Sequence, residues 1–244
     1  MRRVDVLGVG FDPVDVDGAV DAVVALVDQP GPSLVVTANV ELVIAAREAR
    51  DLADILRRAA LVIADGIGVV WGARRLGHSL PGRVPGIDLA DRLCGEAARR
   101  GWTVCLLGGG PGVALRAADN VRRRFPGIQI AATLQGYFGD TEEDVIRTVR
   151  AASPTLLLAG LGSPRQERWL DRHAASLGVR IAIGVGGTLD VWAGRVGRAP
   201  RAVQALGLEW CYRLLRQPSR WRRQLAIPRF IAAVLVASAR TQKR

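Results

Sequence analysis

The chain has 244 residues, 49% hydrophobic and 23% charged, which excludes a disordered chain and allows one large folded domain with or without a smaller addition. Its net charge of +11 at pH 7 is concentrated at one end. Residues 198–244 contain ten Arg, one Lys and a single acidic residue, Glu209, whereas the preceding part of the chain is almost neutral. Such a basic segment favours a polyanionic partner: nucleic acid, an anionic membrane or a pyrophosphate.

The cysteines and the apolar segments restrict the environment of the chain. Cys94, Cys105 and Cys211 are widely spaced and odd in number, which argues against a disulfide framework or a structural zinc site and fits a reducing cytoplasm. The first residues lack the apolar stretch and cleavage site of a signal peptide. The longest apolar segment, residues 230–237, is far shorter than the roughly 20 residues of a spanning helix. We therefore expect a cytoplasmic protein without a transmembrane segment.

Apolar segments of strand length alternate with helical patterns along most of the chain. The predicted strands lack polar alternation, as is typical of parallel strands covered on both faces. They are Val4–Val9, Leu34–Thr37, Leu61–Ala64, Thr103–Leu107, Ile128–Ala131, Thr155–Ala159 and Ile181–Val185. The predicted helices are Val40–Ala59, Ile87–Arg100, Gly112–Phe125, Thr141–Ala152 and Arg165–Leu177. This order predicts a Rossmann-like α/β fold, in which a doubly wound, mostly parallel sheet has helices on both faces.

The composition changes near Gly194–Pro200, where Gly, Arg and Pro cluster and the chain becomes basic. We expect a catalytic α/β domain over residues 1–195 and a basic helical appendage over residues 196–244. Within the appendage, Val203–Leu215 has a helical pattern, and a second amphipathic stretch follows a proline and covers Ser219–Ala237.

In doubly wound sheets, ligands bind beyond the carboxyl ends of the strands, so the residues after each strand are the candidates for a site. Thr37 and Asn39 follow the second predicted strand, where Asn39 also suits a helix cap. Asp65 follows the third strand beside a glycine, and it suits general-base catalysis or helix capping about equally. Arg83, on a turn with Pro and Gly, is either a solvated arginine or a bidentate phosphate ligand.

A glycine-rich turn follows the fourth predicted strand and opens a helix. Gly108, Gly109 and Gly110 have the form of a backbone nest that receives phosphate at a helix N-terminus. Their spacing departs from the GxGxxG dinucleotide motif, and no Gly-Lys-Ser/Thr of a P-loop is present. The alternative, a tight turn without a ligand, is the weaker interpretation of this segment.

Two more strand ends carry polar residues. Gln166 and Glu167 open the helix after the sixth strand, where an amide and an acid suit sugar hydroxyls or plain helix capping. Gly186 and Asp190 follow the seventh strand. No single motif decides the chemistry, but five polar or glycine-rich strand ends and the turn with Arg83 together indicate a nucleotide site.

Other catalytic arrangements are not found in the sequence. His78 and His173 lie in different segments, and neither a zinc-binding motif nor a GxSxG nucleophile elbow is present. Asp15 and Asp17 form a DxD pattern, which can hold a metal–nucleotide complex, but their place at the start of the first helix favours a cap. We expect no cofactor.

Eight short motifs occur in order along essentially the whole chain. They are Thr37-Ala-Asn39-Val-Glu41, Ala64-Asp65-Gly66, Arg83-Val-Pro-Gly-Ile-Asp88, Leu107-Gly-Gly-Gly110, Gly136-Tyr137-Phe138, Gly160-Leu-Gly-Ser-Pro-Arg-Gln166-Glu167, Gly186-Gly187 and Glu209-Trp210-Cys-Tyr212-Arg213-Leu. This ordered set resembles the WecG/TagA/CpsF family of bacterial glycosyltransferases, which make teichoic acid linkage units, capsules and exopolysaccharides. The resemblance implies an inverting, metal-independent transfer of a hexose or N-acetylated sugar from a UDP-sugar substrate to an undecaprenyl-pyrophosphate-linked sugar.

The resemblance also implies roles for individual residues. Asp65 would be the general base, Arg83 the pyrophosphate ligand, and Thr37, Asn39 and Gln166 would position the sugar and the acceptor. The nucleotide would be held by residues at the other strand ends, namely Gly108, Gly109, Gly110, Gly186 and Asp190, with Tyr137 against the uracil.

In the family, the basic appendage docks on the inner face of the plasma membrane and closes over the active site. Arg213, Arg220 and Arg223 match its arginines. Aromatic side chains that suit the headgroup region accompany them, namely Trp210, Tyr212, Trp221 and Phe230. The alternative is a basic helix that packs on the body of the protein, and such a helix would also cover the site.

Two other functions were weighed against the transferase. One is a nucleic-acid-binding protein that uses the basic tail, which the neutral body and the interfacial aromatics disfavour, so we expect no nucleic-acid partner. The other is an NAD-dependent oxidoreductase, which the imperfect glycine loop disfavours. The sequence leaves open the donor sugar, the acceptor sugar and whether the chain forms a homo-oligomer.

Overall fold

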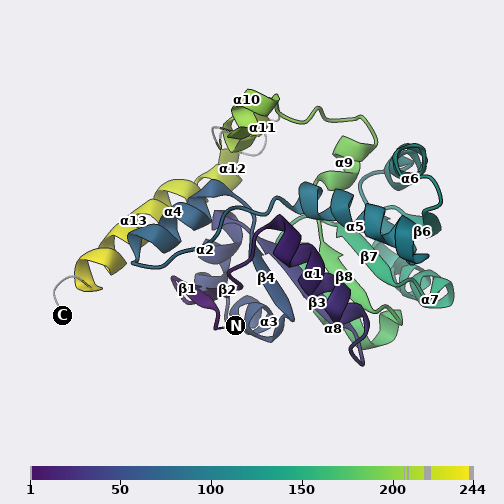
Figure 1. Cartoon of the computed structure of the whole chain (residues 1–244), viewed down its shortest axis with the longest axis horizontal. Helices are drawn as coiled ribbons and strands as arrows, with labels where there is room; N and C mark the ends of the chain where they lie inside the picture. The colour runs from purple at the N-terminus through teal and green to yellow at the C-terminus, as the bar shows by residue number, and fades with distance from the viewer. Residues whose placement is uncertain (1, 206, 208, 217–220, 242–244) are drawn as a thin grey trace.

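A six-stranded parallel sheet forms the centre of the protein (Figure 1). The structure is a computed structural model, and it describes residues 2–205, 207, 209–216 and 221–241. The strand order is β4-β3-β8-β7-β5-β6, and each neighbouring pair is parallel. The strands are β3 (Ser33–Ala38), β4 (Leu61–Ala64), β5 (Thr103–Gly108), β6 (Gln129–Leu134), β7 (Leu156–Gly160) and β8 (Ile181–Gly184). The predicted α/β class with a parallel sheet is therefore confirmed.

The first predicted strand does not belong to this sheet. β1 (Val4–Val6) and β2 (Val9–Phe11) form a separate antiparallel hairpin. The turn between them consists of Leu7 and Gly8, with φ angles of 57° and 90°. Positive φ at both turn residues is what a type I′ hairpin requires. The prediction of one strand over Val4–Val9 was wrong, because the apolar run conceals this two-residue turn.

Helices cover both faces of the sheet. One face carries α1 (Val16–Val27), α5 (Gly86–Arg100), α6 (Val113–Arg124) and α9 (Thr188–Trp192). The other face carries α2 (Val40–Glu48), α3 (Arg50–Arg58), α4 (Ile67–Arg75), η1 (Gly139–Thr141), α7 (Glu142–Ala152) and α8 (Arg165–Leu177). The predicted helix Val40–Ala59 is divided into α2 and α3, because Ala49 has extended backbone angles.

Successive residues of the central strands pack into different cores. Val104 and Leu106 of β5 face α5 and α6, whereas Cys105 and Leu107 face α7 and α8. The side-chain period of two along a strand produces this division, and it explains why the strands read as continuous apolar runs. Burial raises the pKa of the Cys105 thiol to about 12, so the thiol stays protonated and packs as an apolar group.

The C-terminal segment is helical and packs on the half of the protein that contains the hairpin. It comprises α10 (Arg201–Ala205), α11 (Glu209–Arg216), α12 (Trp221–Gln224) and α13 (Ala226–Thr241). Phe230 and Val234 of α13 are buried with residues of α2 and α4, so the prediction that Phe230 lies in the headgroup region was wrong. Gly72 of α4 permits this contact, since a Cβ there would lie 2.6 Å from the Phe230 ring. The domain boundary at residues 195/196 stays a prediction.

No helix in the described part of the chain is both long and apolar enough to span a membrane. In α13, Pro228 lies in the first turn, where its missing N–H leaves no helical hydrogen bond unmade.

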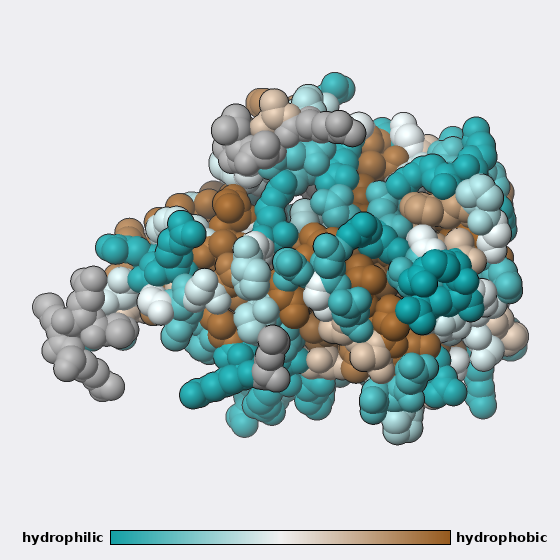
Figure 2. All heavy atoms as spheres, viewed as in Figure 1, coloured by the Kyte–Doolittle hydropathy of each residue, from teal (hydrophilic) through white to brown (hydrophobic). Residues whose placement is uncertain are grey.

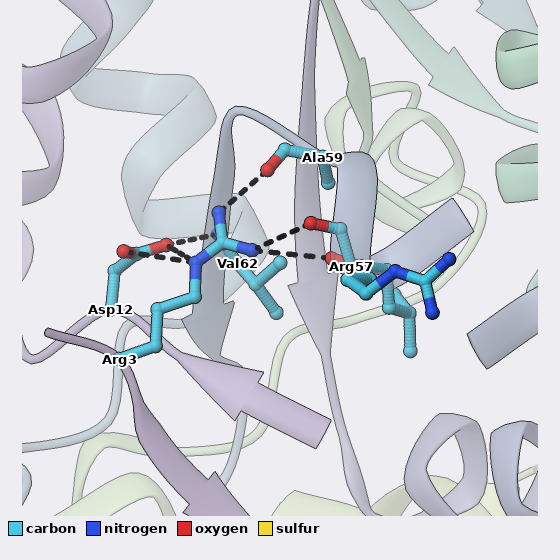
Figure 3. A network of polar contacts seen from close by, with 6 residues as sticks. Arg3, Asp12, Arg57, Ala59 and Val62 are labelled. Atoms are coloured by element: carbon cyan, nitrogen blue, oxygen red, sulfur yellow. Dashed lines mark hydrogen bonds and ion pairs between the residues drawn. The ribbon is translucent and has the colours of Figure 1, made fainter. Parts of the chain in front are cut away.

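An ion pair fastens the hairpin to the rest of the fold (Figure 3). Arg3 Nε donates to both carboxylate oxygens of Asp12, at 3.2 and 3.1 Å. The Arg3 guanidinium also donates to carbonyl oxygens at the end of α3, the closest being Ala59 at 2.6 Å. Asp12 Oδ2 in turn accepts from the backbone N–H of Val62 in β4 at 2.8 Å. The pair therefore completes the hydrogen bonding of a helix end and a strand at once.

We expect Asp12→Ala to lower the free energy of unfolding by about 1–3 kcal/mol, because it leaves the Arg3 guanidinium and the Val62 N–H without their partner. Urea unfolding followed by circular dichroism measures this change. Asp54→Ala removes an exposed pair with Arg57 and serves as the control, with an expected change of about 0.5 kcal/mol or less. Equal effects of the two substitutions would contradict the structural role of Asp12.

Candidate functional site

The carboxyl ends of β3, β8, β7 and β5 lie side by side at the centre of the sheet edge. The chain first builds the two outer parts of the sheet and then returns with β7 and β8 to fill the middle. Most of the predicted site residues follow these strands or β4, so the strand order brings them to one edge, as expected for a doubly wound sheet.

Thr37 and Gln166 hold the end of β8 from two sides. The buried Thr37 hydroxyl, on β3, donates to the carbonyl oxygen of Gly184 at 2.8 Å. Gln166, at the start of α8 and 2% exposed, accepts from the N–H of Gly186 at 3.1 Å. Both contacts lie within three residues of β8, and neither could be foreseen from local sequence. The two side chains therefore fix the loop that leads to Asp190.

Glu167 is a buried acid that the sequence named beside Gln166 but to which no separate role was assigned. Its side chain is 1% exposed, and its Oε1 accepts from Gln166 Nε2 at 2.8 Å. The neighbouring Ser163 hydroxyl also interacts with this carboxyl group. Burial raises the pKa of the carboxyl above its ordinary value, and the Gln166 hydrogen bond opposes this only in part. The acid next to Gln166 in the sequence was the available signal.

Asn39 and Asp65 lie at the ends of adjacent strands. The Asn39 side chain accepts from the backbone N–H of Leu42 at 3.0 Å and caps α2, as one of the two interpretations predicted. The backbone N–H of Asp65 donates to the carbonyl oxygen of Ala38 in β3 at 2.9 Å, which holds the backbone of this half-buried residue beside that strand. The N-cap residue of α4 is Gly66, which has no side chain. The choice between a general base and a helix cap for Asp65 stays a prediction.

Glycine backbones pack against one another at the ends of β5, β7 and β8. A Cβ on Gly108 would lie 2.6 Å from the carbonyl oxygen of Gly160, and a Cβ on Gly160 would lie 2.6 Å from that of Gly186. Gly136, after β6, joins this row, since its Cβ would lie 3.1 Å from Gly108 Cα. Side chains are thus excluded from this edge, where neighbouring backbones are in direct contact.

Polar and aromatic side chains surround the glycine row. Tyr137 follows Gly136 and is 72% exposed, so its ring is available for stacking. Asp190 lies in the first turn of α9 and is half-buried. Arg195, which the sequence analysis did not single out, lies with its guanidinium 3.2 Å from the position of a Cβ on Gly110. Its place in the loop after β8 and α9 was the signal that could have identified it.

Arg83 is engaged by the C-terminal helices. Its Nη1 lies 2.5 Å from Glu209 Oε2, and its Nη2 donates to the carbonyl oxygen of Gln204 at 2.6 Å. Arg223 of α12 approaches the loop after β7, with Nη2 3.7 Å from the position of a Cβ on Gly162. Arg220 and the side chain of Arg213 lie outside the described part of the structure.

A cavity of about 450 Å³ lies on the helical layer formed by α5, α6 and α9. Its lining includes Asp91, Asn120, Trp192 and Arg198, and none of the predicted site residues. An ion pair between Asp91 and Arg124, at 2.7 Å, lies in its wall. In the described ranges, no group of three or more His, Cys, Asp or Glu side chains has the arrangement of a metal site.

Comparison with known proteins identifies the family. Residues 4–244 match the model of the "Glycosyl transferase WecG/TagA/CpsF family". An N-acetylglucosaminyldiphosphoundecaprenol N-acetyl-beta-D-mannosaminyltransferase of Bacillus spizizenii is 36% identical over 85% of this chain and 80% of its own length. An enzyme of the same name from Bacillus subtilis is 34% identical over 86% of this chain and 81% of its own length. Another from Staphylococcus aureus is 32% identical over 99% of this chain and 95% of its own length.

The fold is a parallel α/β sheet with polar residues at its strand ends, and the sequence matches the family model over nearly the whole chain. The protein belongs to the WecG/TagA/CpsF family and is a glycosyltransferase.

The raised pKa of Glu167 predicts how stability depends on pH. The folded protein keeps this proton at pH values where the unfolded chain has lost it, so the free energy of unfolding falls as pH rises above the ordinary value of 4.5. Glu167→Gln removes this loss of stability. The loss amounts to about 1.4 kcal/mol for each unit by which the pKa of Glu167 differs between the folded and the unfolded chain. We therefore expect the variant to gain stability relative to the wild type between pH 4 and 7.

Urea unfolding at a series of pH values measures this difference. Glu143→Gln, which changes an exposed glutamate on the neighbouring α7, is the matched control and should follow the wild type. A stability difference between Glu167→Gln and the wild type that does not vary with pH would contradict the prediction.

Proposed function

We propose that this glycosyltransferase moves an N-acetylhexosamine or hexose from a UDP-sugar to a sugar carried on polyprenyl diphosphate. The observation that carries the proposal is the similarity, over most of both chains, to relatives whose name gives an N-acetylglucosaminyl-diphospho-undecaprenol acceptor and a transferred N-acetylmannosamine. The transfer of N-acetylmannosamine is accordingly the first reaction to test.

Asp65 is the proposed general base. In this mechanism its carboxylate takes the proton of the acceptor hydroxyl while the hydroxyl oxygen forms a bond to the anomeric carbon of the donor. The bond from that carbon to the diphosphate oxygen breaks, and UDP leaves with the electron pair, so the configuration inverts. The attachment of Asp65 to β3 through its backbone supports the role, since a base must be held in a fixed position.

The negative charge on the leaving diphosphate needs stabilisation, which in this metal-independent proposal comes from the protein. Gly112 is the N-cap of α6, so the N-terminus of this helix lies directly after the Gly108–Gly110 turn and favours an anion there. The Arg195 guanidinium lies against the same turn. Backbone dipoles and a cation aimed at the departing oxygen lower the barrier because they are already in place before the reaction.

An exposed apolar surface beside Asp65 supports docking on a membrane. It combines α4, which begins two residues after Asp65, with the C-terminal helices, and brown side chains are visible over α4 and α13 in Figure 2. Its exposed large side chains are Ile67, Trp71, Trp210, Leu215, Trp221, Leu225, Ile231, Leu235 and Val236. Exposed arginines accompany them, namely Arg74, Arg75, Arg216, Arg223, Arg229 and Arg240. An apolar face with cations at its rim is suited to an anionic lipid surface.

The decisive experiment measures UDP release with a short-chain prenyl-diphospho-N-acetylglucosamine acceptor, UDP-N-acetylmannosamine, and EDTA in the buffer. We expect transfer by the wild type and a kcat about 10²- to 10⁴-fold lower for Asp65→Asn, because the amide cannot accept the proton. UDP affinity, measured by calorimetry, should be unchanged.

Asp15→Asn is the control for the assay, since Asp15 caps α1 and asparagine caps equally well. Full activity of Asp65→Asn would exclude Asp65 as the base. No release with any of several UDP-sugars, despite tight UDP binding, would contradict the proposed acceptor class.

For membrane docking, we expect Leu235→Ser combined with Val236→Ser to weaken binding to anionic liposomes about tenfold or more, because two exposed apolar side chains of α13 no longer enter the lipid. Sedimentation with the liposomes measures this binding. Leu115→Ser, which alters an equally exposed leucine on α6, is the control and should bind like the wild type. Unchanged binding of the double variant would contradict the assigned surface.

A further inference from the structure

A network of four charged side chains joins the C-terminal helices to the strand-end site. Glu209 of α11 accepts from Arg83 at 2.5 Å, and its second oxygen lies 3.8 Å from Arg198 Nε. Arg198 Nη2 lies 2.6 Å from Asp88 in the first turn of α5. All four side chains are mostly buried, with exposures from 16% to 34%. The network is thus less screened than the surface pairs of this protein.

The position of Glu209 is notable because it is the single acidic residue between residues 198 and 244. The one carboxylate of this basic segment lies against Arg83, 126 residues away in the sequence. The carbonyl oxygen of Gln204, from α10, accepts from the other terminal nitrogen of Arg83 at 2.6 Å. Two neighbouring helices of the C-terminal segment therefore hold one guanidinium group.

We propose that Glu209 is a positioning residue for Arg83. Glu209 orients the Arg83 guanidinium toward the diphosphate of the lipid-linked acceptor, so the site is complete only when α10 and α11 contact the body of the protein. The inference rests on the proposed function of the chain and deepens it. It assigns to the C-terminal segment a defined contact with the site, carried by a negative side chain and independent of the segment's arginines.

The geometry of an arginine makes this role physically reasonable. A guanidinium group has five N–H donors in one plane, and the contacts of Arg83 with Glu209 and Gln204 use one donor on each terminal nitrogen. Fixing both nitrogens fixes the plane, so the remaining donors face a set direction and can bind a diphosphate oxygen. The side chain keeps 22% exposure, which leaves part of it accessible to a ligand. Without the carboxylate, the long side chain regains its rotamer freedom.

The test is a double-mutant cycle in the transfer assay. We expect Glu209→Gln to lower kcat/KM for the acceptor by about 10- to 100-fold, through a higher KM, because a misplaced binding group loses most of its effect. UDP affinity should not change. If Glu209 acts through Arg83, Glu209→Gln has no further effect in an Arg83→Gln background. Effects that multiply in the double variant would overturn the proposal.

Glu48→Gln is the matched control. Glu48 of α2 pairs with Arg229 of α13, so it also joins a body carboxylate to a C-terminal helix, but both partners are exposed. We expect its kinetics to equal those of the wild type. A similar loss of kcat/KM in Glu48→Gln would show a general effect of loosening the C-terminal helices and would overturn the specific role of Glu209.

A second measurement separates this inference from the proposed function. Hydrogen exchange of residues 196–216 should become faster in both Glu209→Gln and Arg83→Gln, without a further increase in the double variant, whether or not transfer occurs. Faster, non-additive exchange in a protein with no transferase activity would contradict the proposed function alone. Normal acceptor KM in Glu209→Gln, with the wild type active, would overturn the positioning role alone.

Discussion

The close packing of glycine backbones at the ends of β5, β7 and β8 constrains the rest of the structure. Gly108 approaches Gly160, and Gly160 approaches Gly186, so closely that a Cβ on the first of each pair would lie 2.6 Å from a carbonyl oxygen of the second. Three neighbouring strand ends can therefore meet at one level without side chains between them. The functional groups have to come from the flanking strands, β3 and β4 on one side and the loop after β6 on the other, and from the loop that follows β8. The N-terminus of α6, which begins directly after the Gly108–Gly110 turn, suits a diphosphate because its dipole favours an anion.

Two residues expected to contact the sugar also hold this edge together. Thr37 and Gln166 use their hydrogen-bonding groups on Gly184 and Gly186, and Glu167 in turn fixes the Gln166 amide. Loss of activity on substitution of either residue would therefore report partly on the position of the β8 loop. Asn39 has a similar double character, because its side chain caps α2 next to the proposed base. The site and its scaffold are not separable in this part of the fold.

The C-terminal segment combines two surfaces with different chemistry. Toward the body, it contributes Phe230 and Val234 to a core and Glu209 to the charged network. Away from the body, α13 and α4 expose large apolar side chains with arginines around them. If these exposed apolar side chains bind a lipid surface, the same helices contact the enzyme body on one face and the membrane on the other. The proposed role of Glu209 would then make acceptor binding depend on that contact.

The sequence by itself determined the α/β class, six of the strands and the location of candidate residues at strand ends, because apolar runs and helix periods are local properties. It did not reveal the turn at Leu7 and Gly8 or the break at Ala49, since both lie inside apolar or helical patterns. Only the tertiary structure decided which strand ends are neighbours, that Gln166 reaches Gly186, that Glu167 is buried and that Arg83 meets Glu209. These depend on contacts between residues as many as 126 positions apart, whose formation is governed by the packing of the whole sheet rather than by any local pattern.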